Sequence, residues 1–280
     1  MSKHTLFEVR DGIAEITLNR PERMNAFTWQ MGFEVNEHLV RCDEDDSVRA
    51  VVVTGAGRAY CAGADLGRAG GTFDGSDRTE RERAAKARPR TIAPWEVRKP
   101  IIAAINGPAV GVGLTMPLQY DLRIAAVDAK LGFVFVRRGV NTELASTWIL
   151  PRLVGVARAA DLLLSGRVFT GEEAAQIGLV NEALPAEDVL PRAREIAREI
   201  ATNSAPVSVA ITKQMIWEHL GVGDPKIAMK REAAVLGQLG RGPDAREGVV
   251  AWLEKREARW SMRPTADLPE PGPTERSRSD

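Results

Sequence analysis

The sequence predicts an α/β fold in which a parallel sheet with crossover helices is followed by a helical C-terminal region. Residues 48–54 and 101–105 are rich in β-branched side chains and almost continuously apolar, a pattern typical of strands buried on both faces of a parallel sheet. Helical stretches separate the strands, as crossover connections require. A third strand is expected at 122–126. After residue 151 the apolar residues recur at helical spacing.

The N-terminal part is expected to be a hairpin followed by a helix. Apolar and polar residues alternate on both sides of Asp11-Gly12, so residues 5–18 should form two short strands joined by a tight turn. Residues 28–41 carry apolar side chains at helical spacing. The acidic run at 43–46 is interpreted as a solvated helix end and loop rather than an ion site.

Three parts are expected along the chain. Residues 1–200 should form the core, and residues 201–262 a helical C-terminal region. Residues 263–280 combine several prolines with polar side chains, which predicts a disordered tail. The charged, glycine-containing segment 68–98 predicts a partly helical, mobile flap. In the second half of the chain, helices are expected at 157–164, 171–176, 190–202, 206–220 and 245–260.

Composition excludes several classes of function. The 280 residues contain 38 Lys+Arg and 38 Asp+Glu, so the formal net charge is zero and bulk attraction to nucleic acid or an anionic membrane is disfavoured. Neither a membrane-spanning segment nor a secretory leader is expected from the apolar pattern of the sequence. Two cysteines and three widely spaced histidines make no disulfide scaffold and disfavour a zinc site. A cytoplasmic protein without a metal is therefore expected.

Two glycine-bearing junctions, each after a predicted buried strand, are the first candidates for chemistry. They are residues 58–66 (RAYCAGADL) and 106–114 (NGPAVGVGL). Small residues let another backbone or a ligand approach closely. A helix beginning just after Val112 would point its free N–H groups at the junction, which suits a developing oxyanion. Taken alone, each junction is more simply a tight turn that packs a helix on a strand.

Together, in this order and separation, the two junctions resemble those of the crotonase superfamily, the enoyl-CoA hydratases and isomerases. The similarity extends from about Leu6 to Trp260. It implies a crotonase-like core of stacked ββα turns that form a spiral, and a helical C-terminal region that drives assembly into a homotrimer or a dimer of trimers. The other segments that carry the resemblance are 16–26 (ITLNRPERMNA), 99–107 (KPIIAAING), 165–167, 174–180 and 247–256.

The resemblance also implies an acyl-CoA thioester as the ligand, with coenzyme A as part of the substrate and no separate cofactor. By motif position, the main-chain N–H groups of Ala64 and Val112 correspond to the two donors that hold the thioester oxygen. Lys255 and Trp252 match a C-terminal helix that can reach a ligand, sometimes that of a neighbouring subunit. The segments that line the path of the adenine and pantetheine correspond to Met24, Ala26, Ala62, Asp65 and Leu66.

The sequence departs from the family's hydratases at two positions. Those enzymes position and activate water with two glutamates, but the matching positions here hold Thr115 and Phe135, which cannot take up a proton near neutral pH. Glu143 instead stands where one subgroup of isomerases carries a catalytic Glu or Asp, and where dehalogenase members use an Asp nucleophile. Thr142 replaces the proline that often precedes it. The competing interpretation is a surface glutamate that caps a helix from Leu144 onward.

The preferred hypothesis is isomerisation of a 3-enoyl-CoA to a 2-enoyl-CoA. Glu143 would move a proton from C2 to C4 while Ala64 and Val112 hold the dienolate oxygen. Phe135 and Trp148 are assigned to the substrate-binding surface and, with Phe133, are expected to raise the pKa of Glu143, although the same aromatics also fit a plain core. Two alternatives stay open: a hydratase that uses Glu143 alone, and an acyl-CoA-binding protein without catalysis.

Overall fold

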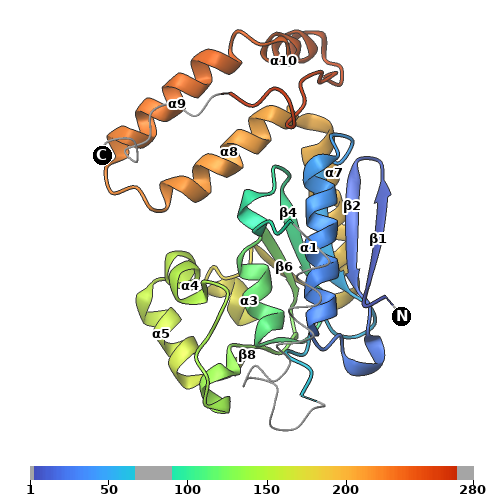
Figure 1. Ribbon diagram of the computed structural model, residues 1–280, viewed down its shortest axis with the longest axis vertical. Coiled ribbons are helices and arrows are strands. Elements are labelled where there is room, and N and C mark those ends of the chain that lie inside the picture. Colours follow the sequence, from blue (N-terminus) through green and yellow to red (C-terminus); the bar gives the residue numbers. More distant parts are fainter. Residues whose placement is uncertain (1–2, 67–89, 270–280) are drawn as a thin grey trace.

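The centre of the protein is a six-stranded sheet in the order β1-β2-β3-β4-β6-β9 (Figure 1). The computed structural model describes residues 3–66 and 90–269. β1 and β2 are antiparallel, and each later neighbouring pair is parallel, as predicted. The strands are β1 Thr5–Arg10, β2 Ile13–Leu18, β3 Ala50–Gly55, β4 Ile101–Ile105, β6 Leu122–Ala126 and β9 Glu182–Leu184.

The predicted hairpin and buried strands are confirmed. Arg10 pairs with Ile13 across the turn, and Asp11 and Gly12 both take positive φ, 51° and 76°, as a two-residue hairpin turn requires. β3 and β4 are buried at every residue. Helix α7 (Ala186–Asn203) packs against β3, β4 and β6, and α1 (Trp29–Glu44) against β1 and β2, so the apolar runs lie inside.

A second, three-stranded sheet stacks successive turns of the chain. It consists of β5 (Ala109–Val110), β7 (Leu131–Gly132) and β8 (Val168–Phe169), in that order. Two isolated bridges extend the stack toward the N-terminus, since Cys61 pairs with Ala109 and Phe27 with Ala64. Each turn thus adds one strand to the large sheet and one short extended segment to the small sheet, which is the arrangement of a ββα spiral.

Most of the predicted helices are present, but several begin or end at residues other than those predicted. Thr28 caps α1 by accepting from the Met31 N–H. Helix α10 ends at Glu254, because Lys255 adopts a left-handed φ of 53°, so the helix predicted to 260 was too long. Helix α9 was not predicted, although Asp224 caps it and Pro225 begins it. Besides α1 and α7, the described helices are α3 Val112–Leu118, α4 Ser146–Val154, α5 Val156–Ser165, α6 Gly171–Gln176, α8 Pro206–His219, α9 Pro225–Leu239 and α10 Pro243–Glu254. The 3₁₀ turns are η1 Pro21–Arg23, η2 Pro94–Glu96 and η3 Val134–Arg138.

Helix α1 ends within the acidic run at 43–46, as expected, but Asp43 is not solvated, because it is buried at 2% exposure. Its carboxylate accepts from the guanidinium of Arg98 at 2.6 and 2.9 Å, and Arg90 also pairs with it. Burial alone would raise the pKa of Asp43, but the hydrogen bonds from Arg98 outweigh burial and hold the pKa below its ordinary value. Asp43 therefore belongs to an ion-pair network that ties the end of α1 to the segment before β4.

The first residues of the predicted tail have fixed contacts. Pro264 is buried and its carbonyl accepts from Arg98 at 3.3 Å, while the Thr265 N–H donates to Asp46 at 3.2 Å. Residues 263–269 therefore differ from the expected disorder, and 270–280 lie outside the described residues, as does most of the predicted flap (67–89). The boundary expected at 200 falls inside α7. Among the described helices, none has the length and apolar character of a membrane span.

Candidate active site

The fold brings the two glycine-bearing junctions into direct contact. The Val110 N–H donates to the Cys61 carbonyl at 3.0 Å. A Cβ on Gly113 would lie 2.1 Å from that same carbonyl oxygen, far inside van der Waals contact. Gly63 takes a φ of 98°, and a Cβ there would lie 3.0 Å from the Val110 carbonyl oxygen. The glycines therefore permit a backbone-to-backbone approach that larger residues would prevent.

The main-chain donors of Ala64 and Val112 are held and available. Helix α3 begins at Val112, directly after Gly111 with its φ of 57°, so the N–H of Val112 has no partner within the helix. Phe27 accepts from Asp65 N–H and donates to the Gly63 carbonyl, at 2.9 and 2.7 Å, which fixes the peptides on both sides of Ala64. Within 3–66 and 90–269, no main-chain carbonyl accepts from either N–H.

The loop that holds Met24 and Ala26 is fastened to the first junction. The Ala62 N–H donates to the Met24 carbonyl at 3.0 Å. Asn25 is fully buried, and its amide donates to the carbonyls of Ala59 and Ala56 at 2.7 and 2.9 Å. Sequence reasoning missed this supporting role of Asn25, although asparagine is one of the few residues that tolerate its left-handed φ of 54°.

Asp65 is the point at which two arginines converge. Its carboxylate pairs with Arg20 at 2.8 Å and with Arg23 at 3.1 Å, and Arg20 also donates to the Ala26 carbonyl at 2.6 Å. The arrangement clamps the 20–26 loop onto the first junction. Asp65 was predicted, but the two arginines were not. Leu66 follows with 52% of its surface exposed.

Glu143 lies in a strained loop before α4. Leu144 and Ala145 both adopt left-handed φ, 52° and 57°, which non-glycine residues reach only at a cost. The Ser146 N–H and hydroxyl both donate to the Glu143 carbonyl, at 3.0 and 2.7 Å, and the hydroxyl also contacts Thr142 Oγ1. Helix α4 starts at Ser146, so the expected helix from Leu144 was wrong.

The carboxylate of Glu143 has no fixed partner in the part of the chain that the structure describes. In the described part of the chain it accepts no hydrogen bond and makes no ion pair, so it does not cap α4. Although the residue is exposed by surface area, partial desolvation raises the pKa of Glu143 above its ordinary value. A carboxylate with a raised pKa and no fixed partner fits a general base better than a helix cap does.

The three aromatics expected around Glu143 do not form one pocket. Phe133 is fully buried and its ring lies 6.2 Å from that of Phe169, so it belongs to the core. Phe135 lies at the second junction, where its Cζ would be 3.9 Å from a Cβ on Gly111. Trp148 is 37% exposed on α4, under the guanidinium of Arg152 at 4.0 Å. Phe133 and Phe135 lie at the start of η3 and Trp148 lies in α4, and the sequence could not place these side chains relative to one another.

The two positions matched to the hydratase glutamates carry no group that can take up a proton near neutral pH. Thr115 is fully buried in α3, and its hydroxyl points back to the Gly111 carbonyl at 3.4 Å. Phe135 is 8% exposed and has no titratable group. The described residues contain no cluster of His, Cys, Asp and Glu side chains that could hold a metal ion. Glu143 is thus the residue among the predicted catalytic set that can exchange a proton.

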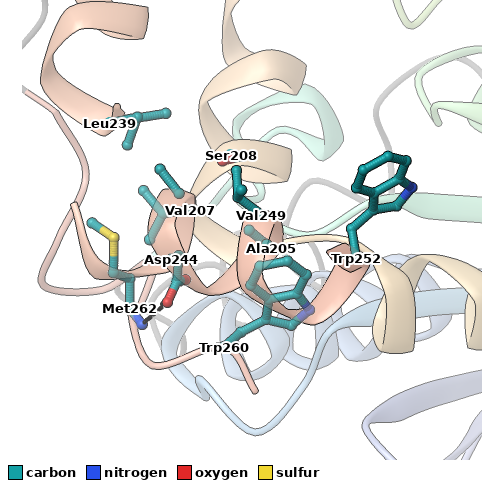
Figure 2. Close-up of a pocket in the computed structure, with 11 residues that line it drawn as sticks. Ala205, Val207, Ser208, Leu239, Asp244, Val249, Trp252, Trp260 and Met262 are labelled. Atoms are coloured by element: carbon teal, nitrogen blue, oxygen red, sulfur yellow. Dashed lines mark hydrogen bonds between the residues drawn. The ribbon is translucent and has the colours of Figure 1, made fainter. Parts of the chain in front are cut away.

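Lys255 lies away from the two junctions of its own chain. It directly follows α10, and Figure 1 shows α10 and α3 toward opposite ends of the molecule. A cavity of about 560 Å³ lies in this C-terminal region (Figure 2). Its wall includes Asp244, whose carboxylate accepts from the Met262 N–H at 3.3 Å. The cavity is separate from the two junctions, because its walls come from α8, α9, α10 and residues 260–262.

The comparisons with known proteins decide the family. The model of the enoyl-CoA hydratase/isomerase family matches residues 8–263. The chain belongs to the enoyl-CoA hydratase/isomerase family. It is similar to the enoyl-CoA hydratase ACTT3 of Alternaria alternata, with 42% identity over 89% of this chain and 83% of that protein. It is also similar to the 1,2-epoxyphenylacetyl-CoA isomerase of Escherichia coli K12, with 35% identity over 93% and 99%.

Solved structures of the enoyl-CoA hydratase/isomerase family share the fold. The crystal structure of a probable enoyl-CoA hydratase/isomerase from Mycobacterium abscessus superposes with a TM-score of 0.85 and 39% identity, over 92% of this chain and 99% of that chain. An enoyl-CoA hydratase from Bacillus anthracis gives 0.82 and 31%, over 92% and 98%. The predicted crotonase-like spiral with C-terminal helices is therefore confirmed, and the protein is an enzyme of this family that acts on acyl-CoA thioesters.

Proposed function

We propose that the protein isomerises 3-enoyl-CoA to 2-enoyl-CoA and that Glu143 is the single acid-base group. The observation that carries this proposal is the state of the Glu143 carboxylate, which has a raised pKa and no partner among the described residues. The positions of the hydratase glutamates support it, since Thr115 and Phe135 offer no base. One carboxylate is sufficient to move a proton between two carbons of the same substrate.

The proposed reaction keeps atoms and electrons in balance. Glu143 takes a proton from C2, and the electron pair of the broken C–H bond delocalises into the thioester and the adjacent double bond as a dienolate. The N–H groups of Ala64 and Val112 stabilise the negative oxygen, by about 3 kcal/mol for each donor. The protonated Glu143 then returns the proton at C4, and the double bond moves into conjugation with the thioester.

The binding of coenzyme A is assigned to the loops fastened at the first junction. The Ala62 N–H donates to the Met24 carbonyl, and Arg20, which pairs with Asp65, donates to the Ala26 carbonyl. This preorganisation supports their role, because a loop that is already ordered loses little entropy when it binds. Leu66 is exposed beside it and would contact the pantetheine.

Hydration by Glu143 alone is the second candidate. The observation in its favour is the set of relatives near 40% identity that are named enoyl-CoA hydratase. A single carboxylate would then activate water for addition to a 2-enoyl-CoA, with the same two N–H donors on the enolate oxygen. A third possibility, acyl-CoA binding without catalysis, is an outcome of the same test.

A substrate panel with product identification tests the proposal. Wild-type enzyme is incubated separately with 2-enoyl-, 3-enoyl- and 3-hydroxyacyl-CoA, and the products are identified by mass spectrometry and ultraviolet absorbance. We expect conversion of the 3-enoyl-CoA to the conjugated isomer to be the fastest reaction. Faster addition of water to the 2-enoyl-CoA would establish the hydratase instead, and tight binding without turnover would establish the binding protein.

We further propose that the chain assembles as a homotrimer or a dimer of trimers. The support is the row of exposed apolar side chains on α10, where Val249, Trp252 and Leu253 are 59%, 78% and 66% exposed. A neighbour that covers α10 would also gain Lys255 near its own ligand. Sedimentation of Trp252→Glu should show dissociation, whereas Leu6→Glu on β1 should leave the assembly intact. A wild-type monomer would contradict this proposal.

We also propose a cytoplasmic location. Cys42 and Cys61 are buried free thiols, and burial raises the pKa of Cys42 to about 12 and that of Cys61 to about 11, so both stay neutral and unreactive. Neither contributes to a disulfide that an oxidising compartment would favour. Recovery of the native protein in a membrane or secreted fraction would contradict this location.

A further inference from the structure

A large cavity opens beside the loop that carries Glu143. It has a volume of about 990 Å³ and lies between α4, α8 and residues 90–98. Ala145, which stands two residues after Glu143, is part of its wall, together with Trp148 one turn further along α4. The cavity therefore lies next to the segment that follows Glu143.

Three tryptophans line the cavity from three different elements. Trp95 and Trp217 pack together with ring centroids 5.8 Å apart, and the Trp217 indole N–H donates to Asp121 at 3.2 Å. Trp148 contributes a third indole from α4. Ile92 and Ile149 complete the apolar part of the wall. Flat apolar faces of this kind favour rings, which stack or pack edge to face against them.

The charged groups of the cavity wall are already paired within the protein. Asp43 binds Arg98 and Arg90, and Glu218 binds Arg231. The Glu96 carboxylate accepts from the Ala93 N–H at 2.8 Å. A carboxylate on the acyl group would meet three carboxylates and only two arginines, both already paired with Asp43, so the cavity suits an uncharged occupant.

The wall of residues 94–99 is fixed before any ligand arrives. Lys213 is buried at 6% exposure. Its ammonium donates to the carbonyls of Pro94 and Lys99, each at 2.9 Å, and pairs with Asp121 at 2.7 Å. Asp121 in turn holds the indole of Trp217. This buried network supports one side of the cavity, and a preformed cavity costs little to occupy.

We propose that this cavity receives the acyl group and selects neutral, ring-bearing acyl-CoA thioesters over short linear and dicarboxylic ones. The volume is at the upper end of that of ordinary small-molecule pockets, roughly 300–1,000 Å³, and exceeds what a four-carbon chain fills. The proposal rests on the proposed function in one respect, which is that the reacting carbons lie at Glu143.

Binding of unreactive esters tests the cavity independently of turnover. Calorimetric titration would compare butyryl-CoA, 4-phenylbutanoyl-CoA and glutaryl-CoA on the full-length wild-type protein. We expect the phenyl ester to bind about tenfold more tightly than the butyryl ester, as burial of a ring implies, and the glutaryl ester no more tightly than the butyryl ester. Equal affinities for the phenyl and butyryl esters, or preference for the glutaryl ester, would overturn the proposal.

Variants of Trp148 locate the effect in the cavity. Trp148→Ala should lose most of the preference for the phenyl ester, measured as the ratio of its affinity to that for butyryl-CoA, whereas Trp148→Phe, which retains a ring, should keep the preference. A preference that survives Trp148→Ala and Trp95→Ala alike would overturn the assignment. Ring-selective binding without isomerisation of any 3-enoyl-CoA would reject the proposed function alone, and isomerisation without ring selectivity would reject the cavity alone.

Discussion

The two glycine-bearing junctions and the Glu143 loop are built in opposite ways. The junctions are buried main chain, held by hydrogen bonds between backbones, and their proposed donors are peptide N–H groups that no side chain defines. The Glu143 loop is exposed, strained at Leu144 and Ala145, and presents one side chain. The geometry of the junctions depends on residues small enough to let the two backbones touch. The proposed chemistry of the Glu143 loop depends on the identity of one side chain.

This difference shows where a family with one fold can vary its chemistry. The proposed stabilisation of an enolate oxygen depends on the spiral itself, because β5 pairs with Cys61 where the two junctions meet. The proposed acid-base group depends on single positions, because Thr115 and Phe135 carry no carboxylate and Glu143 does. The predictions below test each side of this comparison.

The largest effect is expected for Gly113→Ala. The new Cβ would lie 2.1 Å from the Cys61 carbonyl oxygen, a backbone atom that cannot move alone, so the two junctions must separate. We expect either failure to fold or a loss of stability of about 3 kcal/mol with no detectable turnover. Thermal unfolding and kcat/KM measure both. Gly237→Ala, where a Cβ meets nothing within 4 Å, is the matched control, and an active, stable Gly113→Ala would refute the close-packed junction.

The pH dependence of activity should show an acid limb that belongs to Glu143. The base must be ionised, so kcat/KM falls about tenfold per pH unit below the pKa of Glu143. Because desolvation raises the pKa above 4.5, the limb should lie above that value. A profile that stays flat down to pH 4.5 would contradict the assignment.

The same raised pKa has a consequence for stability. The folded protein binds the Glu143 proton more tightly than the unfolded chain does, so this contribution is present below the unfolded pKa and is lost as pH rises through the folded pKa. The free energy of unfolding of Glu143→Gln minus that of wild type should therefore be larger at neutral pH than at pH 4. Denaturant unfolding at the two pH values measures the difference, and the opposite sign would contradict it.

A smaller effect is expected for Ser146→Ala. The variant removes the hydroxyl donor to the Glu143 carbonyl and keeps the N–H donor. We expect stability to fall by about 1 kcal/mol and kcat to fall about tenfold with little change in KM, because the loop aims Glu143 less accurately. Ser165→Ala removes a comparable hydroxyl bond to Asp161 and serves as the control. Equal kcat in both variants would leave Ser146 without a positioning role.

The smallest effect is expected for Asp65→Asn. It weakens the pairing with Arg20 and Arg23 and loosens the 20–26 loop on the first junction. We expect KM for the acyl-CoA to rise a few-fold, about 1 kcal/mol of binding, with kcat nearly unchanged. A fall in kcat with constant KM would place Asp65 on the catalytic side of the comparison instead.

The sequence predicted what depends on neighbouring residues and missed what depends on distant ones. The Asp11-Gly12 turn and the strands β1 to β4 and β6 follow from local patterns, whereas the short strand β9 was not predicted. The burial of Asp43 depends on Arg98, which is 55 residues away, and the role of Asn25 on carbonyls 31 and 34 residues away. Leu144 and Ala145 both adopt left-handed φ, and because neither is glycine or asparagine, no local pattern predicted this conformation.

The site itself divides in the same way. Similarity of motifs assigned the oxyanion donors to Ala64 and Val112 and the acid-base role to Glu143, because these residues lie at fixed offsets from recognisable segments, and these roles stay predictions. It could not separate Phe133 in the core from Phe135 at the junction, since both stand beside the same short strand β7. Nor could it show that Lys255 lies with α10, away from the junctions of its own chain (Figure 1).

Turnover of 3-enoyl-CoA by Glu143→Gln tests the central claim most directly. The substitution keeps the size of the side chain and removes the proton acceptor, so kcat should fall by about 10²–10⁴ while the affinity for a saturated acyl-CoA stays the same. Glu199→Gln on the exposed face of α7 should behave as wild type. A Glu143→Gln enzyme that isomerises 3-enoyl-CoA at the wild-type rate would contradict the account.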